Sequence, residues 1–158
     1  MNMKGGVEQA VYALLVLTRL PRHAMLSGEA LSQQLRVSPT YLQKLMRKLV
    51  QAGIVSSVTG AKGGFRLQAS PDDITIHDVF VAIEGVKSLY RSTGIFEGML
   101  SLNENNACLL SDVMEEAEHA WQAVLKSQSI ASLHRELNQI CSTDYLTKLD
   151  SWLKEVIR

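Results

Sequence analysis

Two short helices separated by a tight turn are the feature of this sequence that most constrains its fold. Ser27 and Ser38 each precede a run of residues with apolar positions at helical spacing. A serine side chain can accept a hydrogen bond from the free amides of a helix's first turn. Pro39 follows at a first helical position, where the N–H group that proline lacks has no partner to lose. The sequence therefore predicts one helix over 27–35 and a second over 38–53.

The sequence period changes directly after the second helix. Two β-rich runs, 54–58 and 65–67, flank a glycine-rich loop over 59–64. This arrangement predicts a β-hairpin. Two helices with a tight turn and a following hairpin form the winged helix-turn-helix pattern. We therefore predict a mainly α fold with a small β-hairpin wing.

Helical spacing of apolar residues predicts four further helices. They lie over residues 7–20, 75–85, 109–128 and about 144–157. Thr75, with Asp78 three residues later, has the pattern of a helix cap. Residues 86–107 have weak periodicity, so we predict a loop there, with a short helix at most.

Charge is distributed unevenly along the chain. Residues 1–70 carry nine lysines and arginines and two acidic residues, a net charge of +7, whereas the remainder carries seven and fourteen, a net charge of −7. No acidic residue lies between Arg36 and Arg66, the stretch that holds the second helix of the pair and the hairpin. A cationic, donor-rich helix fits the charge and the acceptors of a DNA major groove, so the sequence predicts a DNA-binding protein.

The outward face of the helix over 38–53 supplies the predicted DNA contacts. Gln43 is the candidate for reading adenine and Lys44 for reading guanine, because these side chains match the edges of those bases. Arg47 and Lys48 are assigned to phosphates, which set register. The wing adds Lys62 on a glycine loop that can approach a groove closely. The full predicted contact set is Ser38, Pro39, Thr40, Tyr41, Gln43, Lys44, Arg47, Lys48, Thr59, Lys62, Gly63 and Gly64.

Other classes of function find little support in the sequence. It has no nucleophile–base set, phosphate loop or HExxH motif, so we predict that the protein is not an enzyme. The two cysteines, Cys108 and Cys141, match no zinc or redox spacing, and we predict no metal site. No apolar run approaches the roughly 20 residues of a membrane span, and the predicted location is the cytoplasm.

Four segments of the chain resemble one family of winged-helix transcription regulators. They are Ser38-Pro-Thr-Tyr-Leu-Gln-Lys-Leu, Leu49-Val-Gln-Ala-Gly-Ile-Val-Ser-Ser-Val-Thr-Gly, Lys62-Gly-Gly-Phe-Arg-Leu and Ile74-Thr-Ile-His-Asp-Val. The family includes the iron–sulfur cluster regulator IscR, the nitric-oxide-sensing repressor NsrR and the cysteine-metabolism repressor CymR. The similarity is most specific over residues 1–86 and extends more loosely over nearly the whole chain.

The resemblance implies a homodimer that represses transcription from a near-palindromic DNA site, with one half-site per subunit. The chain would divide into a winged helix-turn-helix DNA-binding domain over 1–86, a linker or sensor loop over 87–107, and dimerisation helices over 108–158 that pack back on the first domain. The alternative is a regulatory protein-interaction module that acts through a metabolic enzyme partner. The long helix would cross its counterpart through Val113, Met114, Ala117, Trp121 and Val124.

The resemblance also bears on cofactors. Many members hold an iron–sulfur cluster on three cysteines that precede the dimer helix, and some add a carboxylate from the first helix of the other subunit. Here only Cys108 lies in that region, and Glu8 matches the carboxylate position. One thiolate per subunit is too few for the usual arrangement, so we predict no cofactor, with an iron–sulfur cluster as the alternative. Cys108 and Glu8 are the candidate sensor; the signal stays open between a redox change, a cluster, a small molecule and a partner protein.

Overall fold

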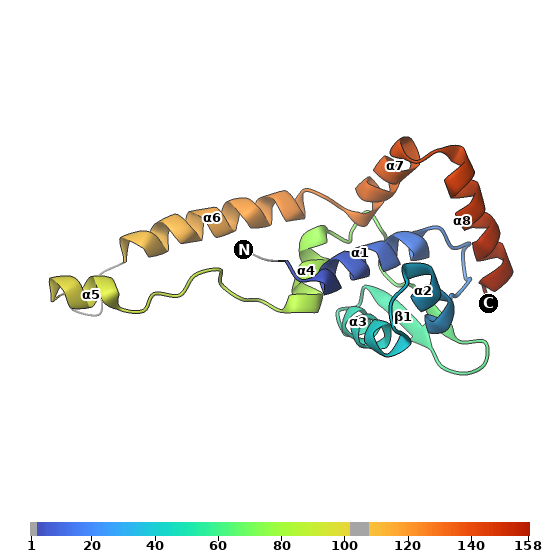
Figure 1. Cartoon of the computed structure of the whole chain (residues 1–158), viewed down its shortest axis with the longest axis horizontal. Helices are drawn as coiled ribbons and strands as arrows, with labels where there is room; N and C mark the ends of the chain where they lie inside the picture. The colour runs from blue at the N-terminus through green and yellow to red at the C-terminus, as the bar shows by residue number, and fades with distance from the viewer. Residues whose placement is uncertain (1–2, 102–107) are drawn as a thin grey trace.

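The computed structural model describes residues 3–101 and 108–158, and this part of the chain holds eight helices and one two-stranded antiparallel sheet. The elements are α1 (Gly5–Thr18), α2 (Gly28–Leu35), α3 (Pro39–Gln51), β1 (Val55–Val58), β2 (Gly64–Leu67), α4 (Ile76–Glu84), α5 (Ile95–Leu100), α6 (Leu109–Lys126), α7 (Ile130–Ile140) and α8 (Thr143–Val156). The mainly α fold with a small hairpin is confirmed. Figure 1 shows α1 to α4, the hairpin, α7 and α8 gathered in one body, from which α5 and α6 extend away.

Side-chain caps fix where the two helices of the helix-turn-helix begin. Ser27 Oγ accepts a hydrogen bond from the Ala30 N–H at 3.2 Å, and Ser38 Oγ accepts one from the Tyr41 N–H at 3.2 Å. Pro39 occupies the first turn of α3. The caps lie where the sequence predicts them, and the bounds of α2 and α3 lie within two residues of the expected ones.

The centre of the body is α1, against which α2, α3, α4 and α7 all pack. The largest fully buried side chains include Leu14, Leu26, Leu31, Leu42, Met46, Leu49, Ile74 and Ile130. Full burial of one such side chain contributes about 1.5–3 kcal/mol. This shared core holds α2 and α3 in a defined relation to each other.

The hairpin is joined to the body through Leu26. β1 and β2 pair in antiparallel register, with Val58 opposite Gly64 at the loop end. The Leu26 N–H donates to Phe65 O at 3.0 Å, and the Phe65 N–H donates to Leu26 O at 2.8 Å. Phe65 is also buried in the core, so the base of the wing is anchored by both its backbone and its side chain.

The helix α7, which the sequence pattern does not predict, lies between α6 and α8. It begins at a capping box in which the hydroxyl groups of Ser129 and Ser132 each accept from the other's backbone N–H. The common form of this box has Glu or Gln at its fourth position, so the sequence signal is weak. Ile130 and Ala131 are buried, and α7 packs against α1.

Arg19, at the end of α1, binds both α7 and α8. Its guanidinium makes a bidentate pair with Asp150 of α8, with both N···O distances at 2.7 Å. It also donates to Asn138 Oδ1 of α7 at 2.9 Å and lies 3.2 Å from His134 Nε2. Because the Arg19 side chain is only 11% exposed, little water is left to replace these partners.

Replacing Arg19 by alanine should lower the free energy of unfolding at pH 7 by about 1–3 kcal/mol, because it leaves hydrogen-bonding groups of α7 and α8 unpaired. Asp150 is partly exposed, which keeps the loss below that of a fully buried pair. Urea denaturation measures the effect. Arg135→Ala breaks only an exposed pair with Asp72 at 3.5 Å and should change stability by less than about 0.5 kcal/mol.

Because of the same network, the free energy of unfolding should decrease as the pH is lowered. Burial and the neighbouring Arg19 lower the pKa of His134, and hydrogen bonds from Arg19 lower the pKa of Asp150. The unfolded chain therefore takes up each proton first, so stability is lost as pH falls below about 6.5 for His134 and below about 4 for Asp150. Equal unfolding free energies for the Arg19→Ala and Arg135→Ala variants from about pH 7 to pH 4 would contradict the role given to the Arg19 network.

Candidate nucleic-acid interface

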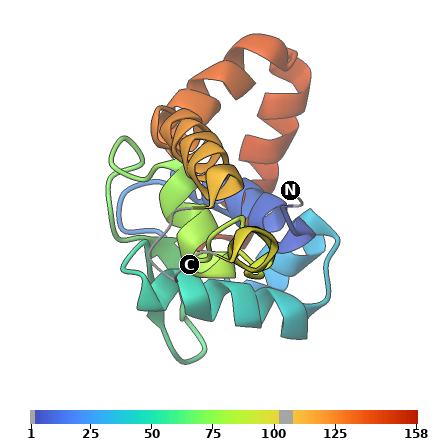
Figure 2. The same ribbon diagram turned by 90° about the vertical axis from the view of Figure 1, so that its left-hand side faces the viewer.

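The helix α3 has one buried face and one exposed face. Its buried side chains are Leu42, Leu45, Met46 and Leu49. Thr40, Tyr41, Gln43, Lys44, Arg47 and Lys48 are exposed. Figure 2 shows α3 lying across the lower surface of the body, with the loop of the hairpin protruding below it. The face that the sequence assigns to DNA is thus directed outward.

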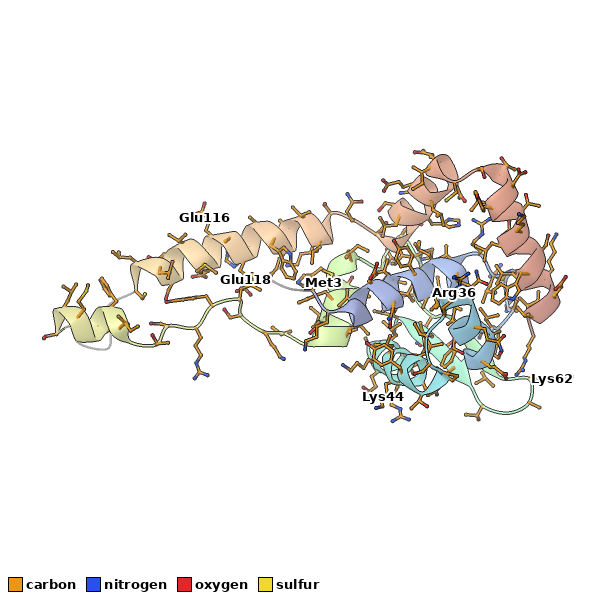
Figure 3. The ribbon with its side chains drawn as sticks, in the orientation of Figure 1. Met3, Arg36, Lys44, Lys62, Glu116 and Glu118 are labelled. Atoms are coloured by element: carbon orange, nitrogen blue, oxygen red, sulfur yellow. The ribbon has the colours of Figure 1, made fainter. Side chains whose placement is uncertain are left out.

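Three cations of this surface carry charge that nothing in the described chain neutralises. Lys44, Arg47 and Lys62 make no ion pair within residues 3–101 and 108–158. Figure 3 shows Lys44 below α3 and Lys62 at the tip of the wing, on the same lower side of the molecule. Their combined field favours an extended anion on this side.

Three other cations of the N-terminal half, Lys4, Arg19 and Lys48, are already engaged. Lys4 pairs with Glu84 at 3.3 Å, and Arg19 pairs with Asp150. Lys48 lies one turn after Lys44, but its Nζ donates to the backbone oxygen of Ile83 in α4 at 2.5 Å. Lys48 therefore ties α3 to α4, and its ammonium group is less available to a phosphate than the sequence pattern suggests.

The first turn of α3 is partly occupied by contacts of its own. Ser38 Oγ caps the helix, while Pro39 and Thr40 are exposed beside it. Tyr41 is 41% exposed, and its hydroxyl packs over Gly6 of α1, where an added Cβ would lie 2.9 Å from the hydroxyl oxygen. Tyr41 thus both holds α3 against α1 and borders the exposed face.

The wing loop divides into an exposed tip and a tightly packed base. Thr59 and Lys62 are exposed at the tip. Gly63 is buried, and a Cβ there would lie 2.1 Å from Val58 O; a Cβ at Gly64 would lie 2.5 Å from Leu26 O. The hairpin itself therefore requires both glycines, which explains them without a groove contact.

The candidate sensor residues lie in two different places within one chain. Cys108 precedes α6, and its Sγ lies 3.8 Å from the Tyr90 hydroxyl. The Ser111 amide lowers the pKa of the Cys108 thiol, whereas the neighbouring Cys108 raises the pKa of Tyr90. Figure 1 shows the start of α6 far from α1, so Glu8 and Cys108 of the same chain do not form one site.

Glu8 borders a pocket behind the helix-turn-helix. The pocket has a volume of about 480 Å³ and lies between α1, the turn from α2 to α3, and the pair α7–α8. Tyr12 and Arg36 contribute polar groups to its wall, and Leu137 and Leu149 contribute apolar ones. Arg36 has a left-handed backbone conformation at the end of α2.

The long helix α6 is in contact with the body mainly through α4. Trp121 packs edge-on against Phe80 of α4, with 4.7 Å between the two ring centroids, so the Trp121 ring is in contact within the chain. Val113 and Val124 are 60% and 64% exposed, and Ala117 between them is also exposed; Met114 is half-buried. The predicted interface residues thus separate into an intramolecular set and an exposed apolar row.

An apolar groove continues this row onto the body and was not foreseen from the sequence. It has a volume of about 500 Å³ and lies between α1, α6 and α7. Its apolar lining includes Val7, Val11, Leu15, Val124, Leu125, Leu133, Leu137 and Ile140. The row on α6 was visible in the sequence, but the groove requires α7, whose signal was weak.

The sequence pattern of the family described as "Rrf2: Iron-dependent Transcriptional regulator" matches residues 3–136. The chain belongs to the Rrf2 family of transcriptional regulators. It is 42% identical over 158 residues to YwgB of Bacillus subtilis, whose name places it provisionally among the HTH-type transcriptional regulators; the match covers 100% of this chain and 98% of YwgB. It is 27% identical to the HTH-type regulator NsrR of Shouchella clausii over 84% of this chain and 88% of NsrR.

Solved structures support the same fold. The chain is similar to CymR, the global cysteine regulator of B. subtilis, with a TM-score of 0.69 and 23% identity over 86% of this chain and 98% of CymR. It is similar to IscR of T. potens with a TM-score of 0.70 and 23% identity over 93% and 96% of the two chains. These likenesses confirm the predicted winged-helix fold and the resemblance noted in the sequence.

Membership of the Rrf2 family confirms two further predictions. The protein is a DNA-binding transcription regulator of the helix-turn-helix type, and it is not an enzyme. Among the helices that the structure describes, none is long and apolar enough to cross a membrane.

The iron dependence in the family's description does not fit the donor set of this chain. Clusters are held mainly by thiolates, and the chain has two cysteines, of which only Cys108 lies beside the start of α6. Cys141 lies at the far end of α7. One thiolate with a phenol neighbour does not make a cysteine-ligated cluster site.

Proposed function

We propose that this Rrf2 protein is a homodimeric, sequence-specific repressor that inserts α3 of each subunit into a DNA major groove. The observation that carries the proposal is the exposed face of α3, on which Lys44 and Arg47 have no ion-pair partner in the described chain. In this arrangement Gln43 and Lys44 reach base edges, and Arg47 binds a phosphate. The wing tip, with Thr59 and Lys62, lies against the flanking backbone or minor groove. The repressor role rests on the resemblance to NsrR and CymR.

The dimer is proposed to form through α6. The exposed apolar row of α6 and the adjoining groove need a cover, and a second copy of the chain presents the same row about a two-fold axis. Two recognition helices would then face successive turns of one duplex, which predicts a near-palindromic site. Residues 1–86 would bind DNA, 87–107 would link, and 108–158 would pair the subunits.

Selection from a random pool of duplexes tests the proposal. The purified wild-type protein should enrich a near-palindrome, and its affinity for that duplex should fall steeply as salt concentration rises. Failure to enrich or shift any duplex would contradict the proposal. If an added metabolic enzyme were required for binding, the alternative of a module that acts through a partner would replace it.

The signal is proposed to act on the Cys108 region without an iron–sulfur cluster. Protein purified without oxygen should show no absorption bands between roughly 320 and 600 nm. Bands in this range that bleach on exposure to oxygen and are absent from a Cys108→Ser variant would contradict the prediction and restore the cluster as the sensor.

A further inference from the structure

The last residues of the chain return to the base of the wing. The Arg158 N–H donates to Met25 O at 2.9 Å, and the Met25 N–H donates to Arg158 O at 2.9 Å. Ile157 also forms an antiparallel β-bridge with Leu26, and Leu26 forms a second one with Phe65 of β2. Leu26 thus lies between the hairpin and the residue that follows α8. These two bridges extend the small sheet into the C-terminal part of the protein.

The Arg158 side chain reaches past this base to the wing loop itself. Its Nη1 donates to Ala61 O at 2.8 Å and to Gly63 O at 3.3 Å. These carbonyl groups belong to the residues on either side of Lys62. Within the loop, the Gly63 N–H also donates to Gly60 O at 2.9 Å. One guanidinium therefore bonds to the peptide group just before Lys62 and to the one that follows Gly63, so it holds the loop on both sides of Lys62.

We propose that Arg158 is a positioning residue that clamps the wing tip and so presents Lys62 to DNA. The inference rests on the proposed function, because it gives the wing a role in DNA binding. Thr59 and Lys62 are exposed, and a tip with few bonds of its own would have to be ordered on each binding event. The clamp orders it beforehand, and it also couples the wing to α8, which Arg19 attaches to α1.

Arg158→Ala removes the guanidinium but leaves the backbone pairing with Met25 in place. We expect this variant to bind the selected duplex about tenfold more weakly, a loss of about 1.4 kcal/mol. Arg135→Ala is the matched control, because it also removes one exposed cation but lies on α7 in a surface pair with Asp72. Its affinity should stay within about twofold of the wild type, and the melting temperatures of both variants should stay close to that of the wild type.

A double-mutant cycle separates positioning from direct contact. If Arg158 acts through the wing tip, Arg158→Ala should weaken binding by less than about threefold in a Lys62→Ala background. The same tenfold loss in both backgrounds would mean that Arg158 binds a phosphate by itself, and would overturn the proposal.

Hydrogen exchange tests the clamp without DNA. The amides of the wing loop, 59–64, should exchange about tenfold faster in Arg158→Ala than in Arg135→Ala or the wild type. Equal exchange in all three proteins would overturn the clamp, even if Arg158→Ala weakened DNA binding. If the wild type bound no duplex, the proposed function and the presentation of Lys62 would both fail, while exchange would still show whether Arg158 orders the loop.

Discussion

Replacing Arg47 by alanine should weaken binding to the selected duplex by about 30- to 150-fold at moderate salt. A typical hydrogen bond contributes roughly 1–1.5 kcal/mol net, and a dimer loses two of them, which gives about 2–3 kcal/mol. The slope of log affinity against log salt should also fall by about two, because two phosphates are no longer neutralised. Fluorescence anisotropy over a salt series measures both quantities. Lys44→Ala should give a loss of affinity of similar size. This loss should be larger for duplexes with the selected base at the Lys44 contact than for duplexes with that base replaced.

Lys48→Ala is the matched control on the same helix. It removes a cation one turn from Lys44, but this ammonium group donates to Ile83 O. We expect its DNA affinity to stay within about threefold of the wild type and its salt slope to stay unchanged, while the free energy of unfolding falls by about 1 kcal/mol. Arg47→Ala should show the reverse pattern. If Lys48→Ala weakened binding as much as Arg47→Ala, the assignment of the two side chains would be wrong.

Ala117→Glu should separate the proposed dimer. Ala117 is exposed between Val113 and Val124 on α6, and at a two-fold interface the substitution brings two carboxylates into an apolar contact. The variant should sediment as a monomer at micromolar concentration. Because each monomer would then bind its half-site alone, we expect DNA affinity to fall by about 100-fold or more.

Ala123→Glu provides the control for this prediction. Ala123 is also exposed on α6, and the substitution is identical, but the residue lies about 120° around the helix from Ala117. This variant should remain dimeric and bind DNA as the wild type does. Dimers of unchanged stability in both variants would show that α6 does not carry the interface.

Local signals in the sequence account for the parts of the structure that were predicted well. Ser27 and Ser38 bond amides three residues away, so their caps depend on little beyond their own turns. The four apolar positions of α3 recur at helical spacing, which makes its exposed face readable without a fold. By contrast, α7 begins with a weaker capping pattern, and the groove beside it was missed with it.

Contacts between distant parts of the chain could not be read from periodicity. Lys48 is exposed, as its spacing predicts, but its Nζ donates to Ile83 O, 35 residues away in the sequence. Trp121 fits the apolar row of α6, but Phe80 engages its ring within the chain. Arg158 meets Ala61 across 97 residues of sequence. A periodic pattern tells which face of a helix is apolar; it does not tell which element covers that face.

Methylation interference on the selected duplex tests the central claim most directly, because it reports which groove α3 occupies. Guanine N7 lies in the major groove, whereas adenine N3 lies in the minor groove. We expect methylation of guanine N7 within each half-site to block binding by the wild-type protein. Interference confined to adenine N3, with methylated guanines bound as well as unmodified ones, would contradict insertion of α3 into the major groove.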